Sequence, residues 1–451
     1  MRSFCLVAYS ALAAIAIAGG APVADTAEQA PGQSPAAGTP STARARNMDT
    51  MAAEYVRLVL AVGQHDHDYV DAYYGPASWK AEAAATKEEL GTIAAKAADL
   101  SRAIDREAEP TDEMDRLRLQ YLRRQMSSLS ARVRMLGGER LSFDAESKAL
   151  YDAVAPTLPE SHFQQILDRL EKRFPGDGPL VERYDAFRRE FVIPPSRLDA
   201  VFQKAIQACA DRTRQHIPLP ADEQFTVEYV TNKSWSGYNW YQGGFRSLIQ
   251  VNTDLPIYVD RAVDLACHEG YPGHHVYNAL LEKHLVKDRG WMEFTVYPLF
   301  SPQSLIAEGS ANFGIEVAFP GTQRVEFERT VLFPAAGLDP NRAAEYYEVQ
   351  GLVDQLAYAG NEAARRYLDG QIDAPHAAAW LERYALMPHD RALQRVKFFD
   401  QYRSYVINYN LGKDMVRRYI EARGGTADHP AQRWAEFEKL ISSPRLPSGL
   451  Q

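Results

Sequence analysis

The sequence has little cysteine, no excess of positive charge and no long apolar run after its first twenty residues. Three cysteines among 451 residues are too few for a disulfide-rich scaffold. The 50 lysines and arginines are outnumbered by 59 aspartates and glutamates, for a formal net charge of −9, which argues against a nucleic-acid partner. No stretch beyond the N-terminus is apolar enough to span a bilayer. We therefore expect no nucleic-acid partner and no integral membrane span in the mature chain.

The one apolar run lies at the N-terminus. Arg2 precedes an apolar stretch from Phe4 to Ala18, which ends in a small-x-small cleavage pattern. These features predict a signal peptide over residues 1–20. Residues 21–47 are rich in Ala, Pro, Gly, Ser and Thr, which predicts a disordered linker. The protein is therefore expected to be exported, periplasmic or secreted, although a frayed N-terminus without function gives a similar composition.

The cysteines are predicted to have no structural or catalytic role. Cys5 lies in the expected signal peptide and would be lost with it. Cys209 and Cys267 both lie in apolar, helix-like surroundings, so we expect two buried free thiols rather than a disulfide.

Apolar residues recur at three- and four-residue intervals through most of residues 48–445, which predicts a mostly α-helical domain. The expected helices include 86–104, 111–136, 161–173, 179–191 and 196–214 before the centre of the chain, and 276–287, 303–319, 341–370, 375–385, 388–423 and 431–441 after it. Between them, residues 225–231 and 245–252 are typical of strands, and 236–244 of a Gly- and aromatic-rich turn. We expect a single domain, which forms either one body or two lobes flanking a cleft. The two strands are expected to form a small sheet or hairpin beside the helix that follows them in the sequence.

The chemistry of the chain is concentrated in His268-Glu269-Gly270-Tyr271-Pro272-Gly273-His274-His275. Imidazoles are preferred zinc ligands, and a nearby carboxylate can act as a general base on a water activated by the metal. Residues four apart share one face of a helix, but here the second histidine is six or seven residues after His268. A Pro-Gly pair breaks a helix, so a bulge at Pro272-Gly273 would return His274 toward His268. The alternative is a pair that merely ends a helix.

A third ligand is expected from the segment Leu305 to Glu316. Glu308 lies among small and apolar residues, where a carboxylate costs free energy unless it is paired or bound to a metal. Glu316, eight residues later on broadly the same face, is predicted to orient a histidine. A surface position on an amphipathic helix is the alternative for both.

These motifs resemble the DUF885 family of zinc-peptidase-like proteins, within the wider gluzincin group. The family pattern of His-Glu-x-x-Pro-Gly-His-His followed by Glu-Gly-x-Ala matches residues 268–275 and 308–311, and the resemblance extends from near Tyr69 to about Gly412. It implies a large helical gluzincin-like domain with a small sheet beside the active-site helix. It also implies one Zn²⁺ ion bound by His268, His274 and Glu308, with Glu269 as the base.

The resemblance implies further roles near the metal. His275 would contact substrate or hold the site together. The segment Arg246 to Asn252 stands where gluzincins have a strand that binds extended peptide through its backbone. Many family members carry Pro-Gly-Gln before a late Tyr-x-x-Gly; here Tyr409-Asn410-Leu411-Gly412 keeps the second part, and Arg403-Ser404-Tyr405 replaces the first.

Two roles follow for this late segment. Tyr409 is predicted to stabilise an oxyanion, with core packing as the alternative, and Arg403 to hold a substrate carboxylate. The segment His65-Asp66-His67-Asp68 matches no trusted ligand pattern and is expected to form a solvated turn.

Three functions remain open from the sequence. The first is a zinc metallopeptidase acting on short peptides, and the second is a zinc amidase acting on a non-peptide or cell-wall amide. The third is a binding protein that has kept the fold and lost the chemistry; retention of Glu269 beside three candidate ligands favours an enzyme.

Overall fold

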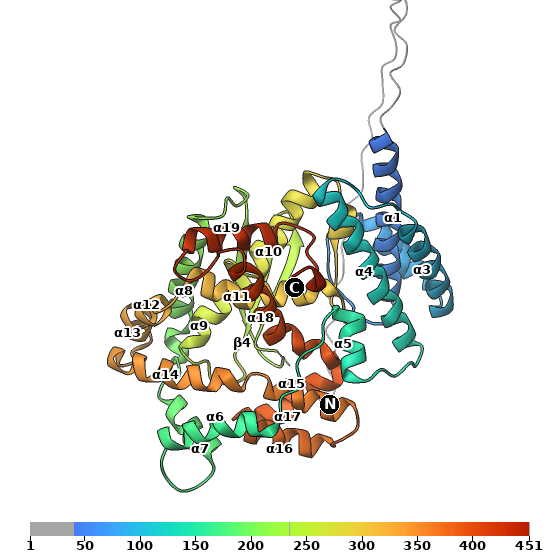
Figure 1. Ribbon diagram of the computed structural model, residues 1–451. Coiled ribbons are helices and arrows are strands. Elements are labelled where there is room, and N and C mark those ends of the chain that lie inside the picture. Colours follow the sequence, from blue (N-terminus) through green and yellow to red (C-terminus); the bar gives the residue numbers. More distant parts are fainter. Residues whose placement is uncertain (1–39, 234, 451) are drawn as a thin grey trace, which may run out of the picture. The chain divides into compact units, whose positions relative to one another are not determined.

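The computed structural model describes residues 40–233 and 235–450, which are mostly helical, as predicted (Figure 1). The expected signal peptide lies outside the described residues, as does the expected linker up to residue 39. Residues 40–47, also assigned to the linker, instead form the beginning of helix α1 (Pro40–Val62). Residues Ala45–Gln451 form one compact unit. Within the described ranges, no helix combines the length and apolar character that a membrane crossing needs.

The helices before the sheet follow the predicted periodicity closely, except that two of them, 77–86 and 143–151, were not predicted. They are α2 (Ala77–Thr86), α3 (Leu90–Asp105), α4 (Glu113–Leu136), α5 (Phe143–Tyr151), α6 (Glu160–Arg173), α7 (Leu180–Arg189) and α8 (Leu198–Arg214). Asp112 caps α4 by accepting a hydrogen bond from the backbone N–H of Asp115 at 3.0 Å.

After the sheet the chain returns to helices, of which those around the site are short. They are α9 (Asp260–Leu265), the π-helical turn η2 (Ala266–Gly270), α10 (His274–Leu281), α11 (Pro302–Ala318), α12 (Gln323–Phe327) and α13 (Phe333–Ala336). The C-terminal part contains α14 (Ala343–Val353), α15 (Ala359–Leu368), α16 (Ala374–Tyr384), α17 (His389–Tyr402), α18 (Ile407–Glu421) and α19 (Pro430–Ile441).

Two helices predicted as continuous, 341–370 and 388–423, are each divided in two. The second division lies at Arg403, whose φ of 52° ends α17. Glu146 fastens this turn, because its carboxylate accepts hydrogen bonds from Arg403 Nε at 2.7 Å and from the Ser404 hydroxyl at 2.7 Å. A long-range ion pair of this kind leaves no trace in the local periodicity.

Helix α11 lies at the centre of the fold and is buried on almost every side (Figure 1). Its sequence is rich in Ala, Gly and Ser, so neighbouring helices approach its backbone closely. The nearest is α18, which crosses α11 at Gly309 and Gly412. A Cβ on Gly412 would lie 2.7 Å from the Leu305 carbonyl oxygen and 3.0 Å from the Gly309 Cα. Glycine at both positions therefore permits backbone-to-backbone packing.

The predicted small sheet is present, but its pairing differs from a simple hairpin. Its strands are β2 (Gln224–Val230), β3 (Gly237–Gly243) and β4 (Arg246–Asn252), in the order β2-β4-β3. β4 pairs in parallel with β2 and antiparallel with β3. The expectation of a turn over 236–244 is therefore wrong, because most of that segment is strand β3. The turn itself is confined to Gly244 and Phe245, which have positive φ, as does Gly243 at the end of β3.

A second, two-stranded sheet pairs β1 (Val70–Tyr73) with β5 (Val296–Pro298). Its register shifts between Val70 and Ala72, which places Asp71 at a bulge. Bulges re-aim side chains, and Asp71 lies beside the candidate site described below.

The two cysteines of the described chain are not free thiols, contrary to the prediction. Cys209 of α8 and Cys267 of η2 form a disulfide, with their Cα atoms 5.7 Å apart. The apolar helical surroundings were interpreted correctly, since both residues are fully buried. The proximity of the two cysteines could not be predicted, because it depends on how α8 packs against η2 across 58 residues of sequence.

Candidate metal centre

The helix that carries His268 breaks where Pro272 and Gly273 predict. The backbone leaves the π-helical turn at Tyr271, and α10 begins at His274. Proline cannot supply the N–H that would continue the helix. The Gly273 N–H donates to the Cys267 carbonyl at 2.9 Å, and a Cβ there would overlap the carbonyl group of His268. A glycine is therefore required for the chain to fold back at this point.

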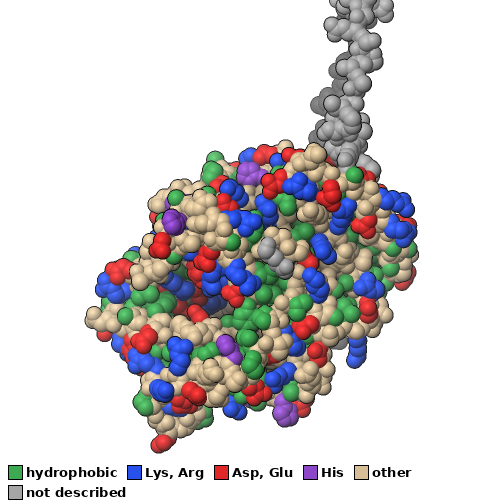
Figure 2. All heavy atoms as spheres, in the orientation of Figure 1, with side chains coloured by type: hydrophobic (Ala, Val, Ile, Leu, Met, Phe, Trp, Pro, Cys, Tyr) green, Lys and Arg blue, Asp and Glu red, His purple; other side chains and the backbone are tan. Residues whose placement is uncertain are grey.

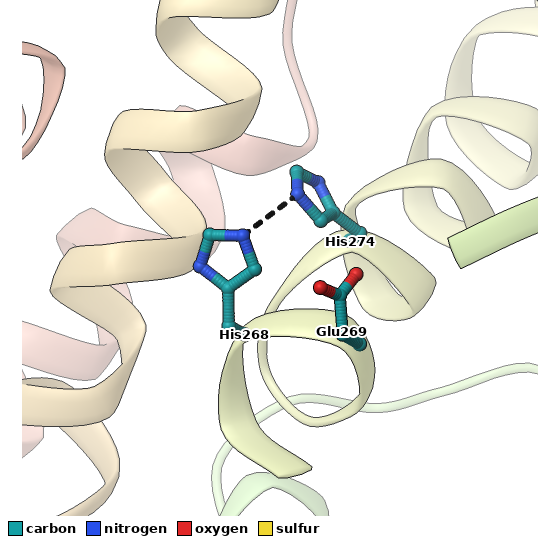
Figure 3. Close-up of side chains that lie close together, drawn as sticks. All are labelled: His268, Glu269 and His274. Atoms are coloured by element: carbon teal, nitrogen blue, oxygen red, sulfur yellow. Dashed lines mark hydrogen bonds between the residues drawn. The ribbon is translucent and has the colours of Figure 1, made fainter. Parts of the chain in front are cut away.

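The break brings two histidines together across six residues of sequence. The Nε2 atoms of His268 and His274 lie 3.1 Å apart, and Figure 3 shows the two rings pointing toward one another from different turns. His275, the other candidate for this position, points elsewhere and is fully buried. Its ring bonds to the Ser247 hydroxyl at 2.9 Å and to the Glu223 carboxylate at 2.8 Å. The structure therefore gives His275 a role in holding β4 to α10, not in facing the metal position.

Glu308 of α11 completes the group. Its Oε2 atom lies 3.2 Å from His268 Nε2 and 3.8 Å from His274 Nε2. That oxygen is buried and receives no hydrogen bond of good geometry. A tetrahedral zinc ion with bonds of about 2.0–2.1 Å holds its ligand atoms about 3.3 Å apart. The three atoms therefore fit a divalent metal ion, and this donor set is of the type that zinc accepts.

The charges of these groups reinforce one another. Burial lowers the pKa of His274, but Glu308, Glu269 and Asp71 outweigh it and raise the pKa to about 9. Burial raises the pKa of Glu308, yet the two imidazoles hold it well below its usual range. In the metal-free protein His274 is therefore protonated, and its positive charge pairs with the Glu308 carboxylate where a metal cation would otherwise bind.

Glu269 lies beside the two histidines, with a carboxylate oxygen within 4.8 Å of a ring nitrogen of each, close enough to share a metal ion with them. Its side chain is buried and points into the same space as the imidazoles of His268 and His274 (Figure 3). Residues of strand β3 contact Glu269 and fix its position. The Asn239 amide donates to the Glu269 backbone carbonyl at 2.7 Å, and a Cβ on Gly237 would lie 2.8 Å from Glu269 Oε1. The carboxylate is thus positioned at the metal position, as a general base requires.

Tyr405 was not predicted as a site residue, but it contacts the centre directly. Its hydroxyl donates to Glu308 Oε1 at 2.8 Å, leaving Oε2 directed toward the histidines. The close packing of Gly309 on Gly412 is what allows this approach. A ligating carboxylate is commonly oriented in this way by a hydrogen bond to its second oxygen. The signal in the sequence was its spacing of four residues from Tyr409.

Tyr409 lies beside Tyr405, with ring centroids 5.8 Å apart, and lines the same cavity as the candidate ligands. Burial and then the charge of Glu308 raise the pKa of its hydroxyl well above the ordinary value. The hydroxyl therefore stays protonated at neutral pH and is available as a donor. Its predicted role toward an oxyanion remains a prediction.

Asp71 is a second residue that sequence reasoning missed. It lies at the β1 bulge, lines the cavity and accepts a hydrogen bond from the Tyr238 hydroxyl. Burial raises its pKa to about 7, against the opposing charge of His274. In the sequence it stands two residues after Tyr69, near which the family resemblance begins.

Two of the predicted supporting residues are engaged elsewhere. Glu316 contacts no histidine; it is ion-paired with Lys413 at 2.8 Å and with Arg417 at 2.5 Å, both from α18. Arg403 is bound to Glu146 at 2.7 Å and does not line the cavity. The orienting role of Glu316 and the carboxylate-binding role of Arg403 are therefore wrong. Glu316 does line the cavity, at a distance from the metal position along α11.

The predicted peptide-binding strand is also misplaced. Segment Arg246–Asn252 is the middle strand of its sheet, so its backbone is already paired on both edges. Arg246 is exposed and outside the cavity. Asn252 lines the cavity, but its amide donates to the carbonyls of Lys233 at 3.1 Å and Trp235 at 2.9 Å. The strand beside Glu269 is β3.

The segment His65–Asp68 forms a turn, as expected. It is less solvated than predicted, because Asp66 is buried and its Oδ2 accepts hydrogen bonds from two nitrogens of Arg132, at 2.5 and 2.8 Å. That ion pair accounts for the buried carboxylate without a metal.

The candidate centre opens into a cavity of about 1800 Å³, lined by His268, Glu269, His274 and Glu308 among others. This volume is larger than a single amino-acid side chain needs and is ample for a short peptide. On the face drawn in Figure 2 the surface is hollowed, with acidic and basic side chains around the hollow.

No family model matches the chain, and no curated protein matches its sequence. Three solved structures resemble this chain at low identity. A provisionally assigned lipoprotein of Colwellia psychrerythraea is 14% identical with a TM-score of 0.48 and covers 79% of this chain, which spans 65% of that protein's length. A provisionally assigned lipoprotein of unknown function from Shewanella oneidensis is 13% identical (TM-score 0.40; 80% of this chain, 76% of that one). Pyrococcus furiosus carboxypeptidase is also 13% identical (TM-score 0.41; 89% and 88%). All three TM-scores are below 0.5, so no statement about this chain rests on these likenesses.

Proposed function

We propose that this protein is a zinc-dependent metallopeptidase that hydrolyses short peptides. One observation supports the proposal above the others. His268, His274 and Glu308 converge within 3.1–3.8 Å of one another, and the buried carboxylate of Glu269 points into the same cavity. A binding protein has no need of a desolvated carboxylate held beside three candidate ligands.

Each of the site residues has a defined part. The Nε2 atoms of His268 and His274 and the Oε2 atom of Glu308 would hold the ion. Zn²⁺ bound there would polarise the scissile carbonyl and lower the pKa of an adjacent water. Glu269 accepts the proton of that water as it attacks the carbonyl carbon, and then delivers it to the leaving amine.

The remaining groups position and stabilise. Tyr405 fixes the Glu308 carboxylate through its 2.8 Å hydrogen bond. The protonated hydroxyl of Tyr409 is the available donor for the oxyanion that develops on the carbonyl oxygen. The disulfide between Cys209 and Cys267 fastens α8 to the residue immediately before His268, which limits movement of the helix that carries the base.

The motifs at residues 268–275 and 308–311 support membership of the DUF885 group, and we propose this family for the chain. We also propose export, since the N-terminal 20 residues have the pattern of a signal peptide and a disulfide is stable outside the cytoplasm.

The proposal is tested by hydrolysis of a panel of short peptides and non-peptide amides by the zinc-loaded protein. We expect peptide cleavage that falls by about 10²–10⁴-fold in Glu269→Gln, while the zinc content stays at wild-type level. Glu326→Gln, an exposed carboxylate of α12 paired only with Arg329, is the matched control and should leave the rate unchanged.

Two outcomes would reject the proposal. Turnover of amides but of no peptide would identify an amidase instead. Peptide cleavage that persists in Glu269→Gln would remove the assigned base.

A further inference from the structure

Helix α17 presents two arginines to the cavity. Arg391 and Arg395 are four residues apart, so they lie on one face of the helix, and both line the cavity that contains the metal position. Neither guanidinium has an ion pair or hydrogen bond within residues 40–233 and 235–450. Arg188, which also lines the cavity, likewise has a buried Nε without a hydrogen-bond partner, whereas Arg324 is paired with Asp264 at 2.8 Å and Arg417 with Glu316 at 2.5 Å.

Arg395 is the more unusual of the two. Its Nε is buried and has no hydrogen-bond partner among the described residues. The guanidinium carbon lies 4.3 Å from the Phe398 ring centroid and 5.7 Å from that of Tyr409. Burial lowers its pKa, and Tyr409 offsets this only in part. A cation in such a place costs free energy in the unliganded protein unless an anion arrives to pair with it.

A short chain of contacts joins Arg395 to the metal position. Its guanidinium lies on the Tyr409 ring, Tyr409 packs against Tyr405 with centroids 5.8 Å apart, and Tyr405 bonds to Glu308. Two tyrosines thus connect the unpaired cation to a candidate ligand, and Arg395 lines the same cavity as the metal position.

The surroundings of Arg391 are different. Burial and the charges of Arg261 and Arg188 lower its pKa, and Arg188 is stacked on Tyr258 with 3.8 Å between guanidinium carbon and ring centroid. Arg391 therefore lies near other arginines and is not part of the chain of contacts that leads to Glu308.

We propose that Arg395 binds the C-terminal carboxylate of the peptide substrate, so that the enzyme releases residues from the carboxyl end of short peptides. This inference rests on the proposed peptidase function and deepens it. A planar guanidinium matches a carboxylate with two parallel hydrogen bonds, and the site replaces the unpaired buried charge with a paired one. The role assigned from the sequence to Arg403 thereby passes to Arg395, eight residues earlier.

Binding can be measured apart from turnover, with the zinc-loaded Glu269→Gln protein. The probes are an N-acetylated alanine tripeptide with a free carboxylate and the same peptide with a C-terminal amide. We expect the acid to bind at least about tenfold more tightly than the amide, as a charge-assisted hydrogen bond allows. Arg395→Ala should reduce acid binding to the level of the amide and leave amide binding unchanged, and Arg395→Lys should be intermediate.

Arg391→Ala is the matched control, since it removes one positive charge from the same helix face and cavity. We expect it to keep most of the preference for the acid. Equal binding of acid and amide, binding of neither peptide, or an equal loss of both in Arg395→Ala would overturn the inference.

Failure of this inference is distinguishable from failure of the proposed function. A protein that cleaves acid and amide equally is a peptidase in which Arg395 does not read the carboxylate. If the protein binds the acid in preference to the amide but cleaves no peptide, the carboxylate site stands and the proposed peptidase function fails.

Discussion

Gly309 of α11 and Gly412 of α18 pack backbone against backbone, and this contact brings Tyr405 onto Glu308. A methyl group on Gly412 would lie 2.7 Å from the Leu305 carbonyl oxygen. We expect Gly412→Ala to force the helices apart, with a loss of about 1–3 kcal/mol in unfolding free energy, and to weaken metal binding as Tyr405 withdraws.

Gly351 is the control for that substitution. It lies in α14, is exposed, and has nothing within 4 Å of the position that an added methyl group would take. Gly351→Ala should stabilise the protein by about 0.5–1 kcal/mol. Chemical denaturation of both variants measures the difference; equal stability of the two would contradict the packing described for Gly412.

The metal-free protein should lose stability as the pH rises from 6.5 to 9. The pKa of His274 rises from 6.5 to about 9 on folding, so its pairing with Glu308 stabilises fully below pH 6.5 and is lost as the pH passes through 9. A shift of that size corresponds to about 3 kcal/mol at most. Because neutral imidazole is the metal ligand, zinc should restore more stability at pH 9 than at pH 6.5.

Thermal unfolding of the metal-free protein across this pH range, with His274→Ala for comparison, measures the effect. The variant should show a flatter pH dependence between 7 and 9. An identical slope in wild type and variant would place the titrating group elsewhere.

The adjacent histidines should behave differently when replaced. His274→Ala is expected to abolish stoichiometric zinc binding. His275→Ala is expected to keep the zinc and to lose stability, because it removes the buried partner of the Ser247 hydroxyl and one of the partners of Glu223, which keeps Tyr271 and Arg214. Zinc content and the denaturation midpoint should be measured on both variants. Zinc should be lost from His274→Ala and kept by His275→Ala, whose midpoint should fall. Loss of zinc from His275→Ala alone would exchange the two assignments.

Replacement of Arg395 should not destabilise the unliganded fold. The guanidinium makes no hydrogen bond or ion pair with the described residues, so Arg395→Met should leave the thermal midpoint unchanged or raise it. Arg118→Met is the comparison, since Arg118 is buried and bonded to Glu293 at 2.5 Å and Asp49 at 2.7 Å. That substitution should cost about 3–5 kcal/mol, because it strands the buried Glu293. A comparable loss in Arg395→Met would show a structural role instead.

Local signals in the sequence were sufficient for the helical fold and for the break in the metal-binding helix. Amphipathic periodicity depends on neighbouring residues, and Pro272 and Gly273 act on the backbone where they stand. The two strands 225–231 and 245–252 were also recognisable. Strand β3 was not, because its glycines and aromatic residues resemble a turn, and the parallel pairing of β2 with β4 is set by tertiary contacts.

The supporting residues of the site depended on distant contacts and were predicted less well. Arg403 was chosen for its nearness to Tyr409 in sequence, but the turn there is bound to Glu146 from α5. Tyr405 meets Glu308 where two separate helices pack together through Gly309 and Gly412. The pairing of Cys209 with Cys267 likewise requires the packing of α8 on η2.

Metal stoichiometry is the most direct test of the central claim, which is that His268, His274 and Glu308 form one metal site. Glu308→Ala and Glu316→Ala remove carboxylates eight residues apart on the same helix, and Glu316 is paired with Lys413 and Arg417. Metal analysis after dialysis should find about one zinc per chain in wild type and in Glu316→Ala, and none in His268→Ala or Glu308→Ala. Absence of stoichiometric zinc from the wild type, or its retention in both His268→Ala and Glu308→Ala, would contradict the account.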